Sequence, residues 1–368
     1  MSEILDRRKL KIMPLANRDS KSNLGIILDP QSPPPPINSN QTEKINQAVK
    51  MIKRAKLNNA PVILIFGAHM IKNGLSKVMS GLMEMGFIDH LATNGAGTIH
   101  DWELAYQGKT EEDVKKYIEK GQFGIWEDTG FYLNLAITLG AAKGLGYGES
   151  IGEMIQNEYL VIPEKRQLEE QIKMALQDQE VSDTLAAKAA LLHSLKLFKL
   201  KAGKIIVPHP HKDLSYQFHA KRLSVPLSVC PGIGYDIIYT HPLNNGASIG
   251  QGALWDFLSF AKSVSKLEKG VLISIGSAVM APQITEKAMS MAKNLAITEN
   301  RDLNDFDILV VDIQKGDWNW QTGEPPKEHP AYYLRFCKSF SRLGGRFSYI
   351  EMDNRDFLIH LYRQFIEP

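Results

Sequence analysis

The run Val62-Ile63-Leu64-Ile65-Phe66, followed at once by Gly67-Ala68-His69, decides the fold class of this chain. Five consecutive apolar residues are far fewer than the roughly 20 that span a bilayer, and they are typical of a strand buried on both faces. A helical pattern over residues 75–82 comes next, and a second apolar run follows at 87–93. A strand, a helix and another strand in this order indicate a parallel sheet.

The same alternation returns late in the chain. Helical patterns occupy residues 252–267, 285–294, 332–343 and 355–366, and apolar runs stand between them at 271–275, 308–311 and 347–350. Apolar strands separated by helices favour a sheet that is covered on both sides. The sequence therefore predicts a doubly wound α/β fold with a mainly parallel, Rossmann-like sheet, to which a mostly helical stretch from 110 to about 200 adds a helical elaboration.

A change of pattern near residue 40 divides the chain. Residues 1–39 lack sustained periodicity, and the proline-rich run from Pro30 to Pro36 favours an extended arm, either a tether or a ligand for a proline-recognising partner. From residue 40 onward, Ile45, Ala48 and Val49 begin a helical face. No glycine- or proline-rich linker separates the helical middle from the rest, so residues 40–368 are predicted to form a single nucleotide-binding domain.

The composition excludes several function classes. The 368 residues carry 43 Lys+Arg against 41 Asp+Glu, a formal net charge of +2, which argues against a polybasic nucleic-acid-binding protein. The amino terminus has charges where a signal peptide is apolar. Two cysteines without a zinc-type spacing fit a reducing compartment. We expect a cytoplasmic protein with no nucleic acid, membrane or metal among its partners.

Three strand ends carry turns rich in small residues. They are Phe66-Gly67-Ala68-His69, Thr93-Asn94-Gly95-Ala96-Gly97 and Ile275-Gly276-Ser277-Ala278. Small side chains let backbone N–H groups approach a phosphate, and ligands of open α/β sheets collect beyond the carboxyl ends of the strands. The full GxGxxG fingerprint is missing, which argues against a standard Rossmann dehydrogenase. Asp312, at the end of the strand 308–311, is either a ribose ligand or a helix cap.

These turns also carry a resemblance to a known family. The segments FGAHMIKNGL (66–75), FIDHLATNGAGTIHD (87–101) and GVLISIGSAVMAPQI (270–284) resemble the deoxyhypusine synthase family, as do residues 228–236, 308–331 and 349–351. The resemblance covers most of the chain after residue 44 and is poor between 110 and 220. It implies an NAD cofactor and a homotetramer with sites shared across a dimer interface. The implied NAD contacts, together with Gly276 of the third turn, are Ala68, His69, Met70, Ile71, Lys72, Asn94, Gly95, Ala96, Asp236, Ser277, Asp312, Ile313 and Glu351.

The resemblance also implies a reaction. In that family NAD takes a hydride from spermidine, an imine remains, and an active-site lysine then carries the aminobutyl group. Counting back along the family pattern places this lysine on Lys338, whereas counting forward reaches Phe336 beside Arg335, so the choice between Lys338 and Arg335 stays open. The chain departs from the family where Ile99-His100 replaces a Glu-Glu pair and Pro282 replaces a histidine. We therefore expect the polyamine-binding acids to be replaced.

Two further residues are catalytic candidates. His100 and Asp101 follow the Gly95 turn, where either is placed to act as an acid or a base, although an aspartate at a helix start also suits the helix dipole. The leading hypothesis is an NAD-dependent transferase that acts on a small-molecule amine through an imine intermediate, and not by spermidine-to-protein transfer. The alternative is a non-catalytic nucleotide-binding or regulatory module of the same fold.

Overall fold

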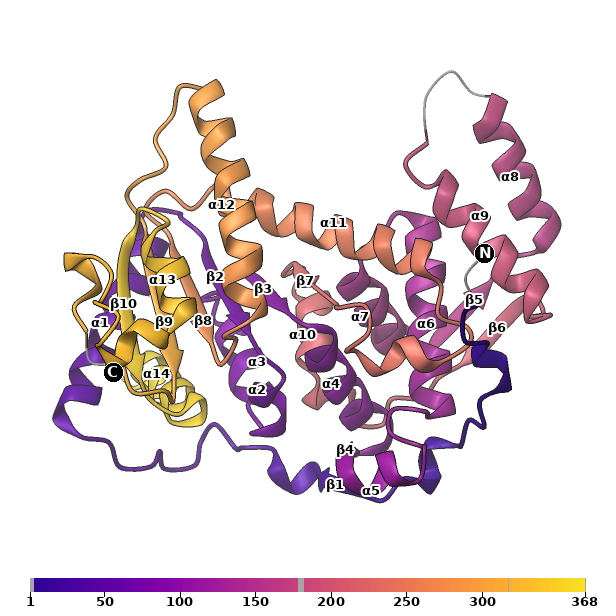
Figure 1. Ribbon diagram of the computed structural model, residues 1–368, viewed down its shortest axis with the longest axis horizontal. Helices are drawn as coiled ribbons and strands as arrows, with labels where there is room; N and C mark the ends of the chain where they lie inside the picture. The colour runs from indigo at the N-terminus through magenta and orange to yellow at the C-terminus, as the bar shows by residue number, and fades with distance from the viewer. Residues whose placement is uncertain (1–2, 178–181, 317, 368) are drawn as a thin grey trace.

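The computed structural model of the protein describes residues 3–177, 182–316 and 318–367, and a six-stranded sheet lies at its centre (Figure 1). The strands of this sheet are β2 (Val62–Phe66), β3 (His90–Thr93), β7 (Leu227–Val229), β8 (Val271–Ile275), β9 (Asp307–Asp312) and β10 (Arg346–Glu351). They stand in the order β10-β9-β8-β2-β3-β7, and each neighbouring pair is parallel. The predicted doubly wound α/β fold is confirmed.

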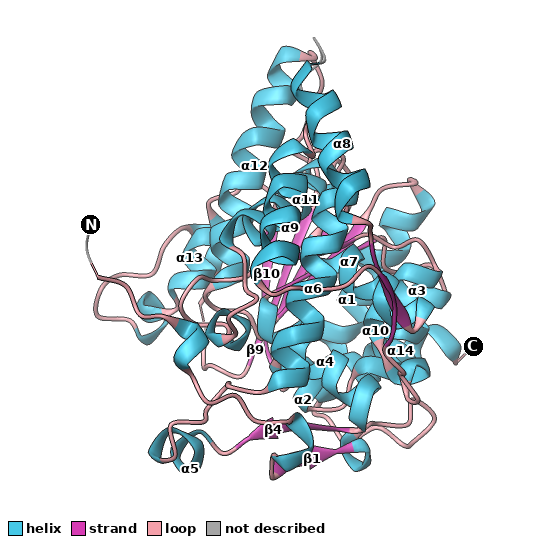
Figure 2. Cartoon of the chain, turned by 90° about the vertical axis from the view of Figure 1, so that its right-hand side faces the viewer, coloured by secondary structure: helices cyan, strands magenta, loops and turns pink. Residues whose placement is uncertain are grey.

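Helices pack around the sheet (Figure 2). They are α1 (Ser39–Leu57), α2 (His69–Lys72), α3 (Ser76–Glu84), α4 (Gly95–Gln107), α5 (Val114–Glu119), α6 (Glu127–Lys143), α7 (Tyr147–Asn157), α8 (Lys165–Gln177), α9 (Leu185–Leu197), α10 (Tyr216–Arg222), α11 (Gly246–Val264), α12 (Met280–Thr298), α13 (Arg335–Ser341) and α14 (Asn354–Ile366). Two short antiparallel pairs lie outside the central sheet. They join β1 (Ser20–Asn23) to β4 (Lys109–Glu112) and β5 (Tyr159–Ile162) to β6 (Gly203–Ile206).

The central strand β2 shows why the sheet is covered on both faces. Its side chains alternate between faces, as the period of two in a strand requires. Leu64 and Phe66 lie in one apolar core with residues of α1, α3, α4 and α14. Ile63 and Ile65 lie in a second core with residues of α11, α12 and α13. Because both faces of β2 are buried, all five of its residues are apolar.

The strand order reverses between β2 and β8. The chain moves outward from β2 to β3 and β7, crosses back, and then moves outward from β8 to β9 and β10. This is the 3-2-1-4-5-6 order of the Rossmann fold, whose ligand crevice opens at the carboxyl ends of the two strands where the order reverses. The turns after β2 and β8 approach so closely that a Cβ on Gly67 would lie 2.2 Å from the carbonyl oxygen of Gly276. Only glycine fits at position 67.

The amino-terminal arm is held to the domain at several points. It runs along the end of the molecule that carries β1 and β4, away from the tips of α8 and α12 (Figures 1 and 2). Besides the β1–β4 ladder, the backbone N–H of Leu15 donates to the Asp128 carboxylate at 2.8 Å, and that of Leu28 donates to the Gly74 carbonyl at 3.0 Å. The carbonyl of Pro35 accepts from His360 Nε2 at 2.7 Å. The arm is therefore part of the packed structure.

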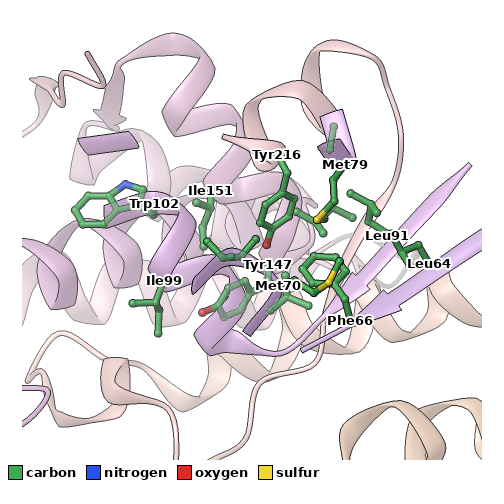
Figure 3. Close-up of a cluster of buried hydrophobic side chains, with 14 of the residues drawn as sticks. Leu64, Phe66, Met70, Met79, Leu91, Ile99, Trp102, Tyr147, Ile151 and Tyr216 are labelled. Carbon is green, nitrogen blue, oxygen red and sulfur yellow. The ribbon is translucent and has the colours of Figure 1, made fainter. Parts of the chain in front are cut away.

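Helix α4 is fixed in place by large buried side chains. Ile99 and Trp102 lie close to Ile151 and Tyr147 of α7 (Figure 3). Phe66, at the carboxyl end of β2, meets Tyr216 edge-on with ring centroids 5.2 Å apart. Ile99 and Trp102 thus pack α4 against α7, and the Phe66–Tyr216 contact packs α10 against the end of β2.

Candidate functional site

The predicted turns lie along one edge of the sheet. Neighbouring strands are in register at their carboxyl ends, where Phe66 pairs with both Thr93 and Ile275, and Asp312 pairs with Glu351. From β3 to β10 this edge spans four interstrand spacings, about 19 Å. We call it the carboxyl rim, made of Gly67, Ala68, Asn94, Gly95, Gly276, Ser277, Asp312, Ile313 and Glu351. The structure thus brings these predicted positions onto one continuous edge.

Predicted contacts in the turn after β2 differ in what they present. Met70 and Ile71 are buried in the core, and their backbone N–H groups donate to the carbonyls of Gly67 and Ala68, whereas His69 is exposed. In the turn after β8, Ser277 Oγ accepts a hydrogen bond from the backbone N–H of Ala281 in the first turn of α12, at 3.2 Å. Side-chain chemistry in these two turns therefore comes from His69 and Ser277.

Large apolar side chains are exposed around the carboxyl rim. Ile233 and Tyr235 follow β7, Val279 follows β8, and Ile313 follows β9, with exposed fractions between 70% and 83%. Single exposed apolar residues are common, but several around one edge are typical of a surface that contacts a ligand or another protein. The rim therefore offers apolar contacts beside its backbone groups.

A pocket of about 220 Å³ opens beside the β3 end of the carboxyl rim. We call it the α4 pocket. It is lined by Arg18, Lys72, Ala96, Ile99, His100, Glu103, Glu111, Glu112, Val114, Phe123, Tyr235, Asp236 and Ile237. Four of the predicted site residues, namely Lys72, Ala96, His100 and Asp236, meet here. The lining residues that come from α4 are spaced i, i+3, i+4 and i+7, which places them on one helical face. They are Ala96, Ile99, His100 and Glu103.

A buried ion pair forms the floor of the α4 pocket. The two carboxylate oxygens of Glu103 each accept a hydrogen bond from the Arg18 guanidinium, at 2.8 and 2.7 Å. Thr110 and Thr129 each donate a further hydrogen bond to the same carboxylate, at 2.7 and 2.8 Å. Burial alone would raise the pKa of Glu103, but the charge and hydrogen bonds of Arg18 hold it below its usual value. Glu103 is therefore ionised at neutral pH.

One more ion pair and one hydrogen bond between uncharged groups line the pocket. Lys72 Nζ lies 2.8 Å from a carboxylate oxygen of Glu111, which also accepts a hydrogen bond from Ser22. His100 Nδ1 lies 2.8 Å from Thr110 Oγ1. Burial lowers the pKa of His100, and this effect outweighs the attraction of Glu103. His100 is therefore a neutral imidazole at neutral pH.

Two carboxylates in the α4 pocket have no cationic partner among the described residues. Glu112 accepts hydrogen bonds from the Gly124 N–H at 3.0 Å and from Trp126 Nε1 at 2.9 Å, and burial raises its pKa. Asp236 accepts from the Gly232 N–H at 2.7 Å, and burial raises its pKa to about 6. With Glu103 and Glu111 already neutralised, the pocket has an excess of negative charge.

Asp101 points away from the α4 pocket. Its carboxylate accepts hydrogen bonds from Ser215 Oγ, from the Tyr216 N–H at 3.2 Å and from Gln217 Nε2 at 3.0 Å, at the start of α10. Only 1% of the residue is exposed. Asp101 therefore joins α4 to α10, and we do not retain it as a catalytic candidate.

Lys338 also lies apart from the α4 pocket, whose lining contains no residue of α13. Its Nζ lies 3.6 Å from a carboxylate oxygen of Glu324 and 3.2 Å from the centre of the Tyr332 ring. Both contacts engage the Lys338 amine outside the α4 pocket. Arg335 is exposed at the start of α13. Neither residue faces the pocket of its own chain.

Three of the four acids of the pocket, Glu103, Glu111 and Glu112, come from positions that sequence reasoning missed. Ile99-His100 replaces the family's Glu-Glu pair, but Glu103 lies one turn further along the same face of α4, and Glu111 and Glu112 come from β4. The i+3 spacing from His100 to Glu103 is a signal that was available in the sequence. Arg18 had none, because it stands alone in a segment without periodicity.

Within the parts of the chain that the structure describes, no group of three or more His, Cys, Asp or Glu is arranged to hold a metal ion. Among the same residues, no helix is both long and apolar enough to cross a membrane.

Fold and site together define an α/β protein with the Rossmann strand order and a charged pocket beside its carboxyl rim. No model of a known protein family and no curated protein matches the sequence. Similar solved structures include AgrE in its ternary complex with ornithine and NAD+, with 12% identity and a TM-score of 0.41 over 89% of this chain and 33% of AgrE. The chain thus spans about a third of the length of that protein.

Two other similar structures match more of their own length. A conserved protein of the LOR/SDH type from Methanococcus maripaludis S2 has 12% identity and a TM-score of 0.43, over 97% of this chain and 75% of that one. A protein assigned as a deoxyhypusine synthase from Entamoeba histolytica has 11% identity and a TM-score of 0.37, over 89% and 88%. Similarity of this degree assigns no activity to the chain.

Replacing Arg18 by alanine leaves the Glu103 carboxylate buried without its cation. We expect Arg18→Ala to lower the free energy of unfolding by roughly 3–5 kcal/mol at pH 7, measured by urea denaturation. The loss should be smaller at pH 5, where Glu103 without Arg18 takes up a proton more readily, and adding Glu103→Gln should recover part of it. Arg166, paired with Glu170 at the exposed surface, is the control. An Arg18→Ala loss no greater than that of Arg166→Ala contradicts this account.

Proposed function

We propose that this protein is an NAD-dependent enzyme that oxidises a small-molecule amine to an imine in the α4 pocket. The proposal rests on two features that lie close together. One is the switch point of a Rossmann-ordered sheet, where two glycine turns meet, and the other is an acidic pocket one strand away. A dinucleotide site and a cation site beside each other are what amine oxidation by NAD+ requires.

The turns at the switch point fit the diphosphate of a dinucleotide. A Cβ on Gly276 would lie 3.6 Å from Asn354 Nδ2, an ordinary contact distance, and the φ of Gly276 is +57°, a left-handed conformation that favours glycine. Backbone N–H groups of Ala68 and Ser277 would hold the phosphates, because those of Gly67 and Gly276 already donate to the carbonyls of Ile275 and Val311. Further along the carboxyl rim, Asp312, Ile313 and Glu351 would hold the ribose and the adenine end.

The turn after β3 suits a different part of the cofactor. The Asp236 carboxylate already lies against the first turn of α4, where a Cβ on Gly95 would come 2.6 Å from its Oδ2. A phosphate at this place would meet that negative charge. The oxidised nicotinamide is a cation, so Asp236 and the Asn94–Ala96 turn would instead receive the nicotinamide end.

The unpaired carboxylates favour a cationic substrate. Glu112 and Asp236 are buried and form no ion pair within the described residues, and a protonated amine between them would give both a cationic partner. Phe123 and Tyr235, which line the same pocket, add aromatic faces of the kind that attract ammonium groups. We therefore infer that the substrate is an amine small enough to enter a pocket of about 220 Å³.

When bound, NAD+ supplies an acceptor for the hydride on the carbon next to the amine nitrogen, and the substrate becomes an imine. The chain's own residues bind and orient the substrate. Glu112 and Asp236 hold the ammonium, while Ile99 and Val114 form apolar walls that limit the access of water.

We further propose that the protein works as a homo-oligomer. Lys338 lies outside the α4 pocket of its own chain, so a transfer step through a lysine requires a second copy. The exposed apolar side chains of Ile233, Val279 and Ile313 around the carboxyl rim are available for that contact.

A negative charge placed on the turn after β2 tests the cofactor site without disturbing the core. We expect millimolar NAD+ to raise the melting temperature of the wild type, and His69→Glu to weaken NAD+ binding at least tenfold, because the exposed side chain at position 69 stands beside the proposed diphosphate. His193→Glu, an equally exposed site on α9, is the matched control. Equal NAD+ affinity of the two variants contradicts the proposal.

An assay of NADH formation distinguishes an enzyme from a non-catalytic binding module. Formation of NADH from a panel of mono-, di- and polyamines supports the enzyme. NAD+ binding without reduction by any amine in the panel supports the alternative, a non-catalytic nucleotide-binding module.

Amine binding should depend on pH through Asp236. Burial raises the pKa of this carboxyl to about 6, so the unliganded fold loses stability as the pH rises from about 4 to about 6, where the unfolded chain has already released the proton. An amine stays protonated throughout this range and prefers the ionised carboxylate, so its affinity should rise between pH 5 and pH 7. In Asp236→Asn, isothermal calorimetry should show a flatter profile, whereas Asp302→Asn, an exposed control, should behave as the wild type. An unchanged profile in Asp236→Asn rejects this role.

A further inference from the structure

We propose that His100 Nε2 is the proton acceptor of the α4 pocket and that Arg18, Glu103 and Thr110 are positioning residues that hold the ring in the tautomer this role needs. The inference deepens the proposed function, because it names the group that receives the proton of the amine. It rests on that function only for the identity of the proton donor. The tautomer itself follows from hydrogen bonds within the chain.

We call the hydrogen bonds that join Glu103, Thr110 and His100 the relay. The donors and acceptors available to these three side chains determine its direction. The Glu103 carboxylate, ionised beside Arg18, has no proton to give and only accepts. Thr110 Oγ1, 2.7 Å away, must therefore point its single proton at Glu103. The same oxygen lies 2.8 Å from His100 Nδ1 and has only lone pairs left to offer. Nδ1 must then carry the proton and donate it to Thr110.

The opposite nitrogen is consequently a base. A neutral imidazole has one N–H, so with the proton on Nδ1 the Nε2 atom keeps its lone pair. Nε2 makes no hydrogen bond to another residue within the described chain, and His100 lines the α4 pocket. Burial lowers the pKa of His100, so the ring is neutral at pH 7 and the Nε2 lone pair is not protonated in advance.

The position of the base matches a step that amine oxidation requires. An amine enters the pocket as an ammonium ion, which has no lone pair to form a C=N bond. One N–H bond of the ammonium breaks, its electron pair stays on nitrogen, and the proton moves to His100 Nε2. That lone pair then forms the C=N bond as the hydride leaves the adjacent carbon for NAD+, which is reduced. The ionised Glu103 stabilises the resulting imidazolium through Thr110.

Arg18 gives the amino-terminal arm a part in this arrangement. Its guanidinium keeps Glu103 ionised, and an ionised Glu103 is what turns the Thr110 proton away from His100. The arm thus acts on the His100 tautomer through Glu103 and Thr110.

Nitrogen-15 NMR of the histidine side chains tests the relay on the full chain without cofactor or amine. We expect His100, assigned by loss of its signals in His100→Gln, to carry its proton on Nδ1 at pH 7. Thr110→Ser keeps the hydroxyl and should keep this tautomer, whereas Thr110→Val removes the acceptor and should shift the ring to the other tautomer or to a mixture. His90, held between Ser228 and Ser263, is an internal control whose signals should not change.

Two results would overturn the inference. They are a wild-type His100 with the proton on Nε2, and a Thr110→Val protein whose His100 keeps the wild-type tautomer. The wild-type spectrum is decisive even if Thr110→Val does not fold. In turnover assays, Thr110→Val should lower kcat at least tenfold and change KM for the amine less than threefold. A wild-type protein with the expected tautomer that oxidises no amine leaves the relay standing and rejects the proposed function alone.

Discussion

A carboxylate with almost no access to water organises this site. Glu103 receives two hydrogen bonds from Arg18 and one each from Thr110 and Thr129. These partners belong to the amino-terminal arm, β4 and α6, so one buried charge joins three segments to α4. A buried charge costs several kcal/mol unless it is paired and hydrogen-bonded. Moving any of these segments would leave the charge unsatisfied, which is why the α4 pocket has a defined shape.

The sheet supplies the other half of the arrangement. The Rossmann strand order brings the turns after β2 and β8 into contact at the switch point, where Gly67 has no room for a side chain. Strand β3 lies next to β2, and α4 starts directly after it, so the helix that carries His100 and Glu103 begins one strand away from the switch point. The topology therefore places the two glycine turns and the start of α4 side by side.

The fold was largely predictable from the sequence, whereas the site was predictable only in part. Strands such as 62–66 and 271–275 are buried on both faces, so their apolar runs are unmistakable, and the turns after them were found for the same reason. Strands β1 and β4 have four residues each and contain no apolar run. They pair only with each other, outside the central sheet, so they are not buried on both faces. Arg18, Thr110 and Glu112 lie on or next to these strands, and only the tertiary structure brings them to His100. Periodicity also could not distinguish His100 from Asp101, since adjacent residues of a helix point about 100° apart and only packing shows which one meets the pocket.

A crystal structure of the protein grown with NAD+ would show whether the dinucleotide lies along the carboxyl rim. We expect the diphosphate against the backbone of Gly67–Ala68 and Gly276–Ser277, with the nicotinamide directed toward Asp236 and the α4 pocket. NAD+ bound away from the carboxyl rim, or with its adenine end in the α4 pocket, would contradict the account. So would a rim that binds no NAD+ at a concentration that saturates the protein in solution.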